Sequence, residues 1–195
     1  FNSQAVIALI KSLYFDAYRL GEVSQNIAIT EPVLRDADIV SIDLSAIKYS
    51  EVKANNNASP NGLTGVEVCA IARYAGLSDK VSSFGVYEYN PKLDNNHQTA
   101  KLIAQLIWYF IEGVNFRTND YPFENKEKYK KYIVLLDERI IHFYKSNKSD
   151  RWWMEISTNN NHSKTTLIPC TYQDYLDACN QNIPNRCLAA FKKLN

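Results

Sequence analysis

The chain has 195 residues, of which 46% are hydrophobic and 22% charged, and its formal net charge is +1. This length and composition predict a soluble globular protein with one sizeable core, or a core and a small appendage. The near-neutral balance does not favour the strongly basic surface typical of nucleic-acid binding, so we expect no nucleic-acid partner. The longest apolar stretch, LIAQLIWYFI, is shorter than the ~18 residues of a membrane span, so we expect no membrane partner.

The first part of the chain alternates between helix and strand patterns. Apolar spacing predicts a helix over residues 4–14, and Thr30 caps a short helix with Pro32 in its first turn. Residues 38–43 form a short apolar strand typical of a buried parallel position. Residues 44–62 are rich in Asn and Ser and have no periodicity, which at this length is typical of a functional or mobile loop.

A second strand follows between two helices. Thr64 and Glu67 predict the capping box of a helix that ends at Gly76 in a left-handed conformation. Residues 80–91 form a strand that ends near Glu88, and residues 99–112 carry a wide apolar helix stripe. The order helix, strand, helix, strand, helix predicts an α/β fold with a parallel sheet covered on both faces.

The pattern changes after Gly113. The runs KKYIVLL, RIIHFYK and RWWMEIS predict an antiparallel β-meander, and Thr171 caps a last helix that ends before Pro184. We therefore expect an α/β domain over residues 1–113 and a β-meander with a terminal helix over residues 114–195. This second part is an appendage, either a subdomain or an oligomerisation element.

The four cysteines contain no C-x-x-C pair and have no histidines at zinc-finger spacing. This pattern predicts reduced thiols in a cytoplasmic protein. The alternative is a disulfide between Cys179 and Cys187.

Two carboxylates stand where the two predicted strands end. In an open parallel sheet, ligands bind at the carboxyl ends of the strands, so Asp43 and Glu88 are expected on one edge. A lone aspartate there is more often a helix cap or a salt-bridge partner than a metal ligand, and a glutamate is more often half of an ion pair. Arg19 and Arg73 are the candidate charge partners.

Several motifs occur together in a fixed order: SIDLSAIKYS, NASPNGLT, and YEYNPKLD followed by TAKLIAQLIWYFIEG. The set resembles the carboxyl-terminal half of the ureohydrolases, the arginase, agmatinase and formimidoylglutamase family, and in particular a divergent bacterial formimidoylglutamase-like or arginase-like branch. The resemblance implies a three-layer α/β/α arginase-like fold and, in active members, two manganese ions that activate water for attack on a guanidinium or amidine carbon. It further implies a homo-oligomer and a longer protein, of which this chain would be the carboxyl-terminal half.

The resemblance assigns roles residue by residue. Asp43 matches the family's first metal-binding aspartate, and Glu88 matches the glutamate of E-x-N-P, which binds the cationic end of the substrate. Ser59 and Asn61 are further substrate-binding candidates. Two departures oppose metal binding, because Ser45 and Lys48 stand where the family has its second and third aspartates. The family's G-G-D-H and D-A-H-x-D segments do not occur in this sequence.

These departures leave two hypotheses for function. In the favoured one, Asp43 is the remnant of a degenerate metal site, no manganese binds, and the chain is a non-catalytic relative that binds a small amidine or guanidinium ligand or a protein partner. The pair Trp152 and Trp153 could contribute to such a surface, although packing of the meander is the favoured explanation for it. In the alternative, an upstream segment completes a manganese-dependent hydrolase of a linear amidine or guanidinium substrate.

Overall fold

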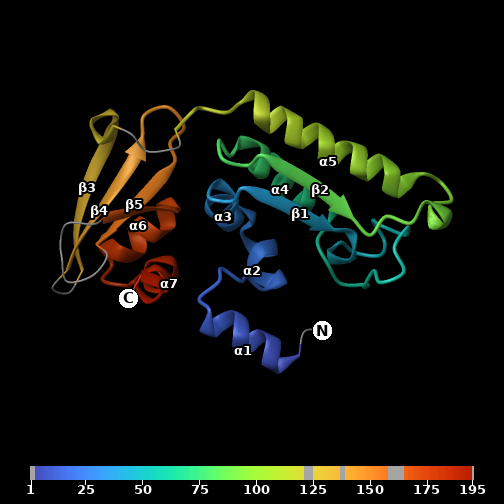
Figure 1. Ribbon diagram of the computed structural model, residues 1–195, viewed down its shortest axis with the longest axis horizontal. Coiled ribbons are helices and arrows are strands. Elements are labelled where there is room, and N and C mark those ends of the chain that lie inside the picture. The colour runs from blue at the N-terminus through green and yellow to red at the C-terminus, as the bar shows by residue number, and fades with distance from the viewer. Residues whose placement is uncertain (1–2, 121–124, 137–138, 158–164, 195) are drawn as a thin grey trace. The chain divides into compact units, whose positions relative to one another are not determined.

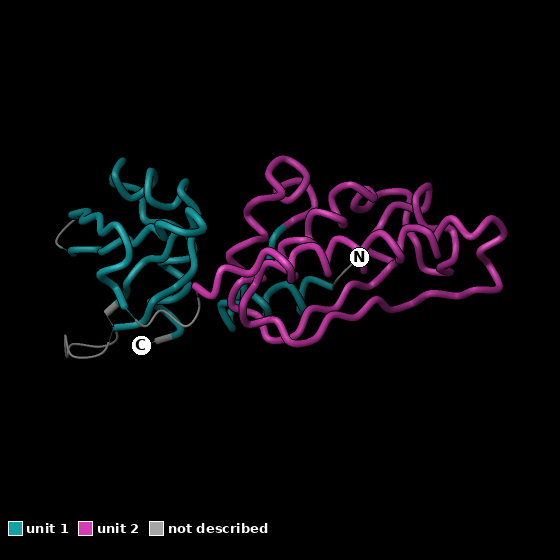
Figure 2. Tube along the Cα trace, turned by 90° about the horizontal axis from the view of Figure 1, so that it is seen from above, with its two compact units in different colours: residues 1–18, 122–195 teal, residues 19–121 magenta. Residues whose placement is uncertain are grey.

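The computed structural model describes residues 3–120, 125–136, 139–157 and 165–194, which divide into two compact units (Figure 2). Unit 2 comprises Arg19–Tyr121, and unit 1 comprises Phe1–Tyr18 together with Pro122–Asn195. The expected division between residues 113 and 114 therefore differs from the structure in two ways. The segment after residue 113 belongs to unit 2 as far as residue 121, and the amino-terminal helix belongs with the carboxyl-terminal part.

Polar contacts explain both differences. The backbone N–H groups of Asn119 and Asp120 donate to the carboxylate of Asp79, at 3.1 and 2.9 Å, and so tie this segment to unit 2. In unit 1, Arg186 lies 3.4 Å from the carboxylate of Asp16. Such contacts join residues far apart in the chain, which a pattern of local spacing does not reveal.

Unit 2 contains the alternating helices and strands that the sequence predicts for an α/β fold (Figure 1). Its helices and strands are α2 (Leu20–Gln25), α3 (Glu31–Arg35), β1 (Ile39–Asp43), α4 (Gly65–Leu77), β2 (Ser83–Tyr87) and α5 (Gln98–Asn115). β1 and β2 pair in parallel, with Ile39 opposite Ser83 and Asp43 opposite Tyr87. The α/β class and the parallel pairing are confirmed, whereas the short helix α2 was not predicted.

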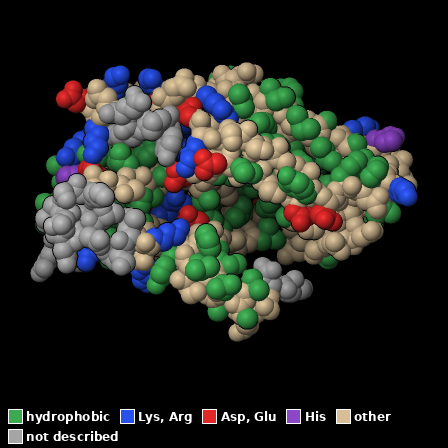
Figure 3. Space-filling view, in the orientation of Figure 1, with side chains coloured by type: hydrophobic (Ala, Val, Ile, Leu, Met, Phe, Trp, Pro, Cys, Tyr) green, Lys and Arg blue, Asp and Glu red, His purple; other side chains and the backbone are tan. Residues whose placement is uncertain are grey.

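The core of unit 2 lies between the sheet and its helices. Along β1, Val40 and Ile42 are buried, while Ile39, Ser41 and Asp43 on the opposite face are exposed. The cluster around Ile42 includes side chains from α4 and α5, namely Val68, Cys69, Ala72, Leu102 and Leu106. Figure 3 shows further hydrophobic side chains at the surface over α5. Strand alternation therefore directs one face of β1 into the helices and leaves Asp43 on the other.

Two glycines allow α4 and α5 to approach closely. A Cβ on Gly76 would lie 2.1 Å from the carbonyl oxygen of Phe110, and a Cβ on Gly113 would lie 2.5 Å from that of Arg73. The prediction that Gly76 ends the helix in a left-handed conformation was wrong, because Gly76 lies within α4 and has no positive φ. Its lack of a side chain serves helix packing rather than a turn.

Unit 1 contains the predicted meander with additional elements. Its helices and strands are α1 (Gln4–Ser12), β3 (Tyr129–Leu136), β4 (Arg139–Ser146), β5 (Trp152–Ser157), β6 (Thr165–Cys170), α6 (Tyr172–Cys179) and α7 (Asn185–Leu194). The four strands form an antiparallel sheet in the order β3-β4-β5-β6. The sequence did not predict α7 or β6. Pro169 argues against a central strand, but β6 is an edge strand, where proline is tolerated.

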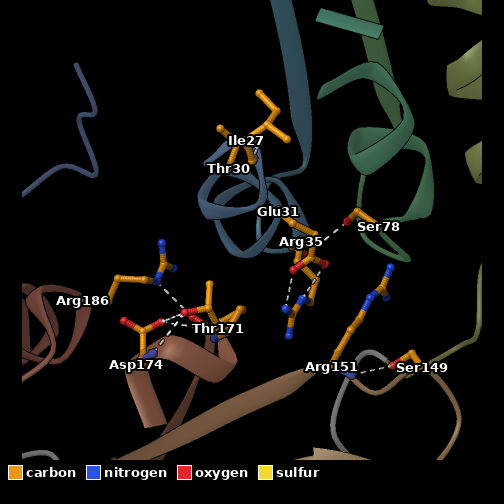
Figure 4. A network of polar contacts seen from close by, with 11 residues as sticks. Ile27, Thr30, Glu31, Arg35, Ser78, Ser149, Arg151, Thr171, Asp174 and Arg186 are labelled. Carbon is orange, nitrogen blue, oxygen red and sulfur yellow. Dashed lines mark hydrogen bonds and ion pairs between the residues drawn. The ribbon is translucent and has the colours of Figure 1, made fainter. Parts of the chain in front are cut away.

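Local capping and long-range packing both stabilise these elements (Figure 4). The Thr171 N–H donates to Asp174 Oδ2 at 2.7 Å, and the Asp174 N–H donates to Thr171 Oγ1 at 3.1 Å, which confirms the predicted cap of α6. In unit 2, the buried Arg35 donates to Glu31 on the same helix, and its carbonyl accepts the hydroxyl of Ser78 at 3.1 Å. This last bond links α3 to the end of α4.

The structure decides two expectations about unit 1, namely the role of its tryptophan pair and a disulfide between Cys179 and Cys187. Trp152 and Trp153 are buried, and the ring centroid of Trp152 lies 5.0 Å from that of Tyr175 on α6. Packing therefore accounts for the tryptophan pair. Cys179 and Cys187 are both free thiols, so the alternative disulfide is not formed.

Among the helices that the structure describes, none has the length and apolar character needed to cross a membrane.

Candidate functional site

The parallel register brings the two predicted carboxylates to one edge of the sheet. Asp43 is the last residue of β1 and pairs with Tyr87, so Glu88 follows one residue beyond the end of β2. Both residues are exposed. This edge, with the loop between β1 and α4, is the rim, and Asp43 and Glu88 are the acidic residues at its two strand ends.

Asp43 has a defined local role. Its Oδ1 accepts the backbone N–H of Ser45 at 2.8 Å and so caps the short 3-10 turn Leu44–Ala46. This is the capping function that an aspartate commonly has where a strand leads into a turn. One carboxylate oxygen is thereby engaged by the backbone.

Glu88 has an unusual backbone. Its φ is 68°, in the left-handed region that residues with a Cβ rarely adopt. Its carbonyl oxygen accepts the side-chain N–H of Asn55 at 3.0 Å. Asn55 is only 4% exposed, although it belongs to the polar loop before α4. Sequence reasoning did not select Asn55, because its contact with Glu88 spans 33 residues.

The loop over residues 44–62 is folded along the rim. Residues Ile47 and Leu63 form a parallel bridge, and the Lys48 N–H donates to the Leu63 carbonyl at 2.9 Å. A Cβ on Gly62 would lie 2.7 Å from the carbonyl oxygen of Ala46, so glycine is required for this approach. The two ends of the loop therefore lie side by side.

Ser59 and Asn61, the further binding candidates, lie within this folded loop. The Ser59 carbonyl accepts the N–H of Tyr49 at 2.8 Å, and Ser59 Oγ accepts the N–H of Asn61 at 3.4 Å. Both residues are exposed. In the part of the chain that the structure describes, neither forms a hydrogen bond with Asp43 or Glu88.

The arginines do not neutralise the rim. Arg73 Nε donates to Glu112 Oε2 at 2.9 Å, across the contact between α4 and α5. Arg19 is exposed, and its backbone N–H donates to Glu22 in the first turn of α2. Among the described residues no ion pair joins either arginine to Asp43 or Glu88, so the expectation of such a pair was wrong. Arg73 pairs with Glu112 because the crossing of the helices brings α5 beside it.

The rim residues do not by themselves provide a metal centre. Within residues 3–120, 125–136, 139–157 and 165–194, no group of three or more His, Cys, Asp or Glu side chains could hold a metal ion. Ser45 contributes a backbone donor to Asp43. Lys48 lies close enough to Glu67 that, after the larger effect of the Thr64 hydrogen bond, its charge helps to lower the pKa of Glu67. The described donor set therefore does not fit two manganese ions.

A second polar cluster lies on the antiparallel sheet of unit 1. Glu155 pairs with Lys126, and its Oε2 lies 2.9 Å from the Tyr144 hydroxyl and 3.1 Å from His142 Nδ1. Burial by itself raises the pKa of Glu155, but hydrogen bonds from Lys126, Thr165, Tyr144 and His142 together lower it to about 2. All these bonds favour the ionised carboxylate, so the cluster is a satisfied structural network.

Comparison with known proteins identifies the family. The model of the arginase family matches residues 3–112, which is more than half of the chain. The chain belongs to the arginase family. The match covers α1 and nearly all of unit 2 but leaves the antiparallel sheet outside it.

Known relatives are longer than this chain. It is 34% identical over 83 residues to the formimidoylglutamase of Staphylococcus haemolyticus, a region that spans 42% of this chain and 27% of the relative. The structure is similar to formimidoylglutamase from Bacillus subtilis, with a TM-score of 0.54, 22% identity and coverage of 63% and 39% of the two chains. It is also similar to arginase from Bacillus caldovelox, with a TM-score of 0.50, 20% identity and coverage of 60% and 40%. At these identities the structural likeness concerns the fold alone.

Proposed function

We propose that this chain contributes the substrate-side rim of an arginase-family fold and binds a small guanidinium or amidinium cation without metal-dependent catalysis of its own. The observation that supports this most directly is the position of Glu88, one residue beyond β2 and on the same edge as Asp43. Its side chain is exposed, and no described residue donates a hydrogen bond to its carboxylate. A carboxylate in this state can accept two parallel N–H bonds from a planar cation.

The absence of catalysis is proposed from the residues that follow Asp43. Ser45 and Lys48 replace the two further aspartates that the family pattern places there, and this exchange removes negative charge and adds a positive one. Divalent cations are held by several anionic oxygens, and a nearby ammonium opposes their binding. Asp43 would then persist as a turn cap and a remnant of the metal site.

A second function has specific support from sequence similarity. The 34% identity to a formimidoylglutamase favours a manganese-dependent hydrolase of a linear amidine. In that case residues outside this chain would supply the missing metal ligands, and Asp43 would join them. The two functions differ in whether metal is bound.

The test is a titration followed by NMR at the Glu88 and Asp43 amides, with methylguanidine hydrochloride and formamidine as probes. We expect saturable shifts in the wild-type chain that disappear in Glu88→Gln. The matched control is Asp38→Asn. Asp38 lies just before the first residue of β1, at the end of the strand away from Asp43, and its side chain is 71% exposed. Binding that is retained in Glu88→Gln, or absent from the wild type, would refute the proposal.

Elemental mass spectrometry separates the two functions when it is done on this chain together with the residues outside it that the second function requires, purified without chelator. We expect manganese far below one ion per chain, both in the wild type and in Asp43→Ala. Near-stoichiometric manganese that Asp43→Ala removes would instead support the hydrolase and overturn the proposal of a metal-free site.

A further inference from the structure

Asn55 connects the long loop to the acidic rim. Its side chain is 4% exposed, and both ends of its amide are engaged. Nδ2 donates to the Glu88 carbonyl at 3.0 Å, and Oδ1 accepts the Asn57 N–H at 2.6 Å. A buried amide with both halves satisfied is held in one orientation, so it can fix the position of the groups that it contacts.

The group that Asn55 contacts is in an uncommon conformation. Glu88 has a φ of 68°, and a left-handed backbone is unfavourable for a residue with a Cβ unless its surroundings impose it. The ladder between β1 and β2 ends at Tyr87, so the strands themselves do not impose it. The bond from Asn55 is directed at the carbonyl of this same residue.

A backbone bond beside Asn55 strengthens the connection. The Asn90 N–H donates to the Ala54 carbonyl at 2.9 Å, and the Ala54 N–H donates to the buried Thr99 Oγ1 at 3.3 Å. The segment that contains Asn55 is therefore anchored both to the residues after Glu88 and to the first turn of α5. Asn55 therefore follows a residue whose backbone is held by hydrogen bonds at both its carbonyl and its N–H.

We infer that Asn55 is a positioning residue: it holds Glu88 in the left-handed conformation and so sets the direction in which the Glu88 carboxylate leaves the rim. The consequence for ligand binding rests on the proposed function, in which Glu88 accepts paired bonds from a planar cation. Such bonds require a defined carboxylate direction. The conformational part of the inference holds with or without a ligand.

The conformational test uses NMR on the whole chain. The one-bond Cα–Hα coupling of Glu88 distinguishes positive from negative φ, and we expect the positive-φ value in the wild type. Asn55→Ala should shift it to the negative-φ value. Asn55→Asp should do the same, because it keeps the acceptor for Asn57 but loses the donor to Glu88. The matched control is Asn56→Ala, the same change at an exposed neighbour, which should leave the coupling unchanged.

The ligand readout is a methylguanidine titration of the same variants. We expect binding to be roughly fivefold weaker in Asn55→Ala, which is the size of effect expected from one lost hydrogen bond. Binding should be unchanged in Asn56→Ala. A wild-type coupling that persists in both Asn55 variants overturns the inference, whatever the affinity. If the wild type binds no cation, the proposed function fails while the coupling still decides the role of Asn55. If Asn55→Ala does not fold, the coupling in Asn55→Asp decides it.

Discussion

The contact between α4 and α5 predicts a strong effect of replacing Gly76 with alanine. The added Cβ would lie 2.1 Å from the Phe110 carbonyl oxygen, whereas ordinary contact begins at 3.4 Å. Neither partner is a flexible side chain, so the two helices would have to move apart by about 1 Å. Overpacking of this kind costs ~1–3 kcal/mol, against a gain of up to ~1 kcal/mol from higher helix propensity. Because the clash is with backbone, we expect a net loss near ~2 kcal/mol.

Gly21 provides a matched control for this substitution. It lies in α2 of the same unit, has no positive φ, and a Cβ there would meet nothing within 4 Å. Gly21→Ala should therefore raise the stability of unit 2 by ~0.5–1 kcal/mol, through helix propensity alone. The two variants share one chemical change and should move stability in opposite directions.

Hydrogen exchange measured by mass spectrometry across a urea series is the suitable assay. Peptides from α4 and α5 report on unit 2 directly. Tryptophan fluorescence is less suitable, because the buried Trp152 and Trp153 belong to unit 1. We expect the unfolding midpoint of these peptides to fall in Gly76→Ala and to rise in Gly21→Ala. A midpoint in Gly76→Ala at or above that of wild type would show that the helices do not need this close approach.

Two further predictions concern single polar side chains. Because the pKa of Glu155 is lowered from 4.5 to about 2, its contribution of at most ~3 kcal/mol is present above pH 4.5 and is lost as the pH falls towards 2. The loss of stability with falling pH, followed by tryptophan fluorescence, should therefore be smaller in Glu155→Gln than in the wild type. The exposed control Glu127→Gln should lose stability as the wild type does, and equal acid profiles for the two variants would contradict this reasoning. Thr64→Ala should destabilise α4 by ~1 kcal/mol through loss of the bond to the Glu67 N–H at 3.3 Å, while Thr64→Ser keeps it. Equal urea midpoints for the two Thr64 variants would exclude a capping role.

Local chemistry made several elements predictable. The capping boxes at Thr64 and Thr171 satisfy donors three residues away, so both residues of each box can be read together from the sequence. The alternation along β1 and the strand end at Asp43 follow from apolar spacing in the same way. The ordered motifs around Asp43 and Glu88 also indicate the arginase family, because their residue types and spacing are properties of the sequence alone.

Tertiary structure decided the features that depend on distant residues. Arg73 pairs with Glu112, 39 residues away, because two glycines let α4 and α5 meet, and neither glycine reveals its partner in the sequence. Asn55 reaches Glu88 across 33 residues, although its segment has only a polar composition. The sequence by itself thus determined most of the elements, though not α2, β6 or α7, together with the family and the acidic positions, since these depend on neighbours within a few residues. The packing of the elements decides which side chain contacts Glu88 and which carboxylate pairs with Arg73.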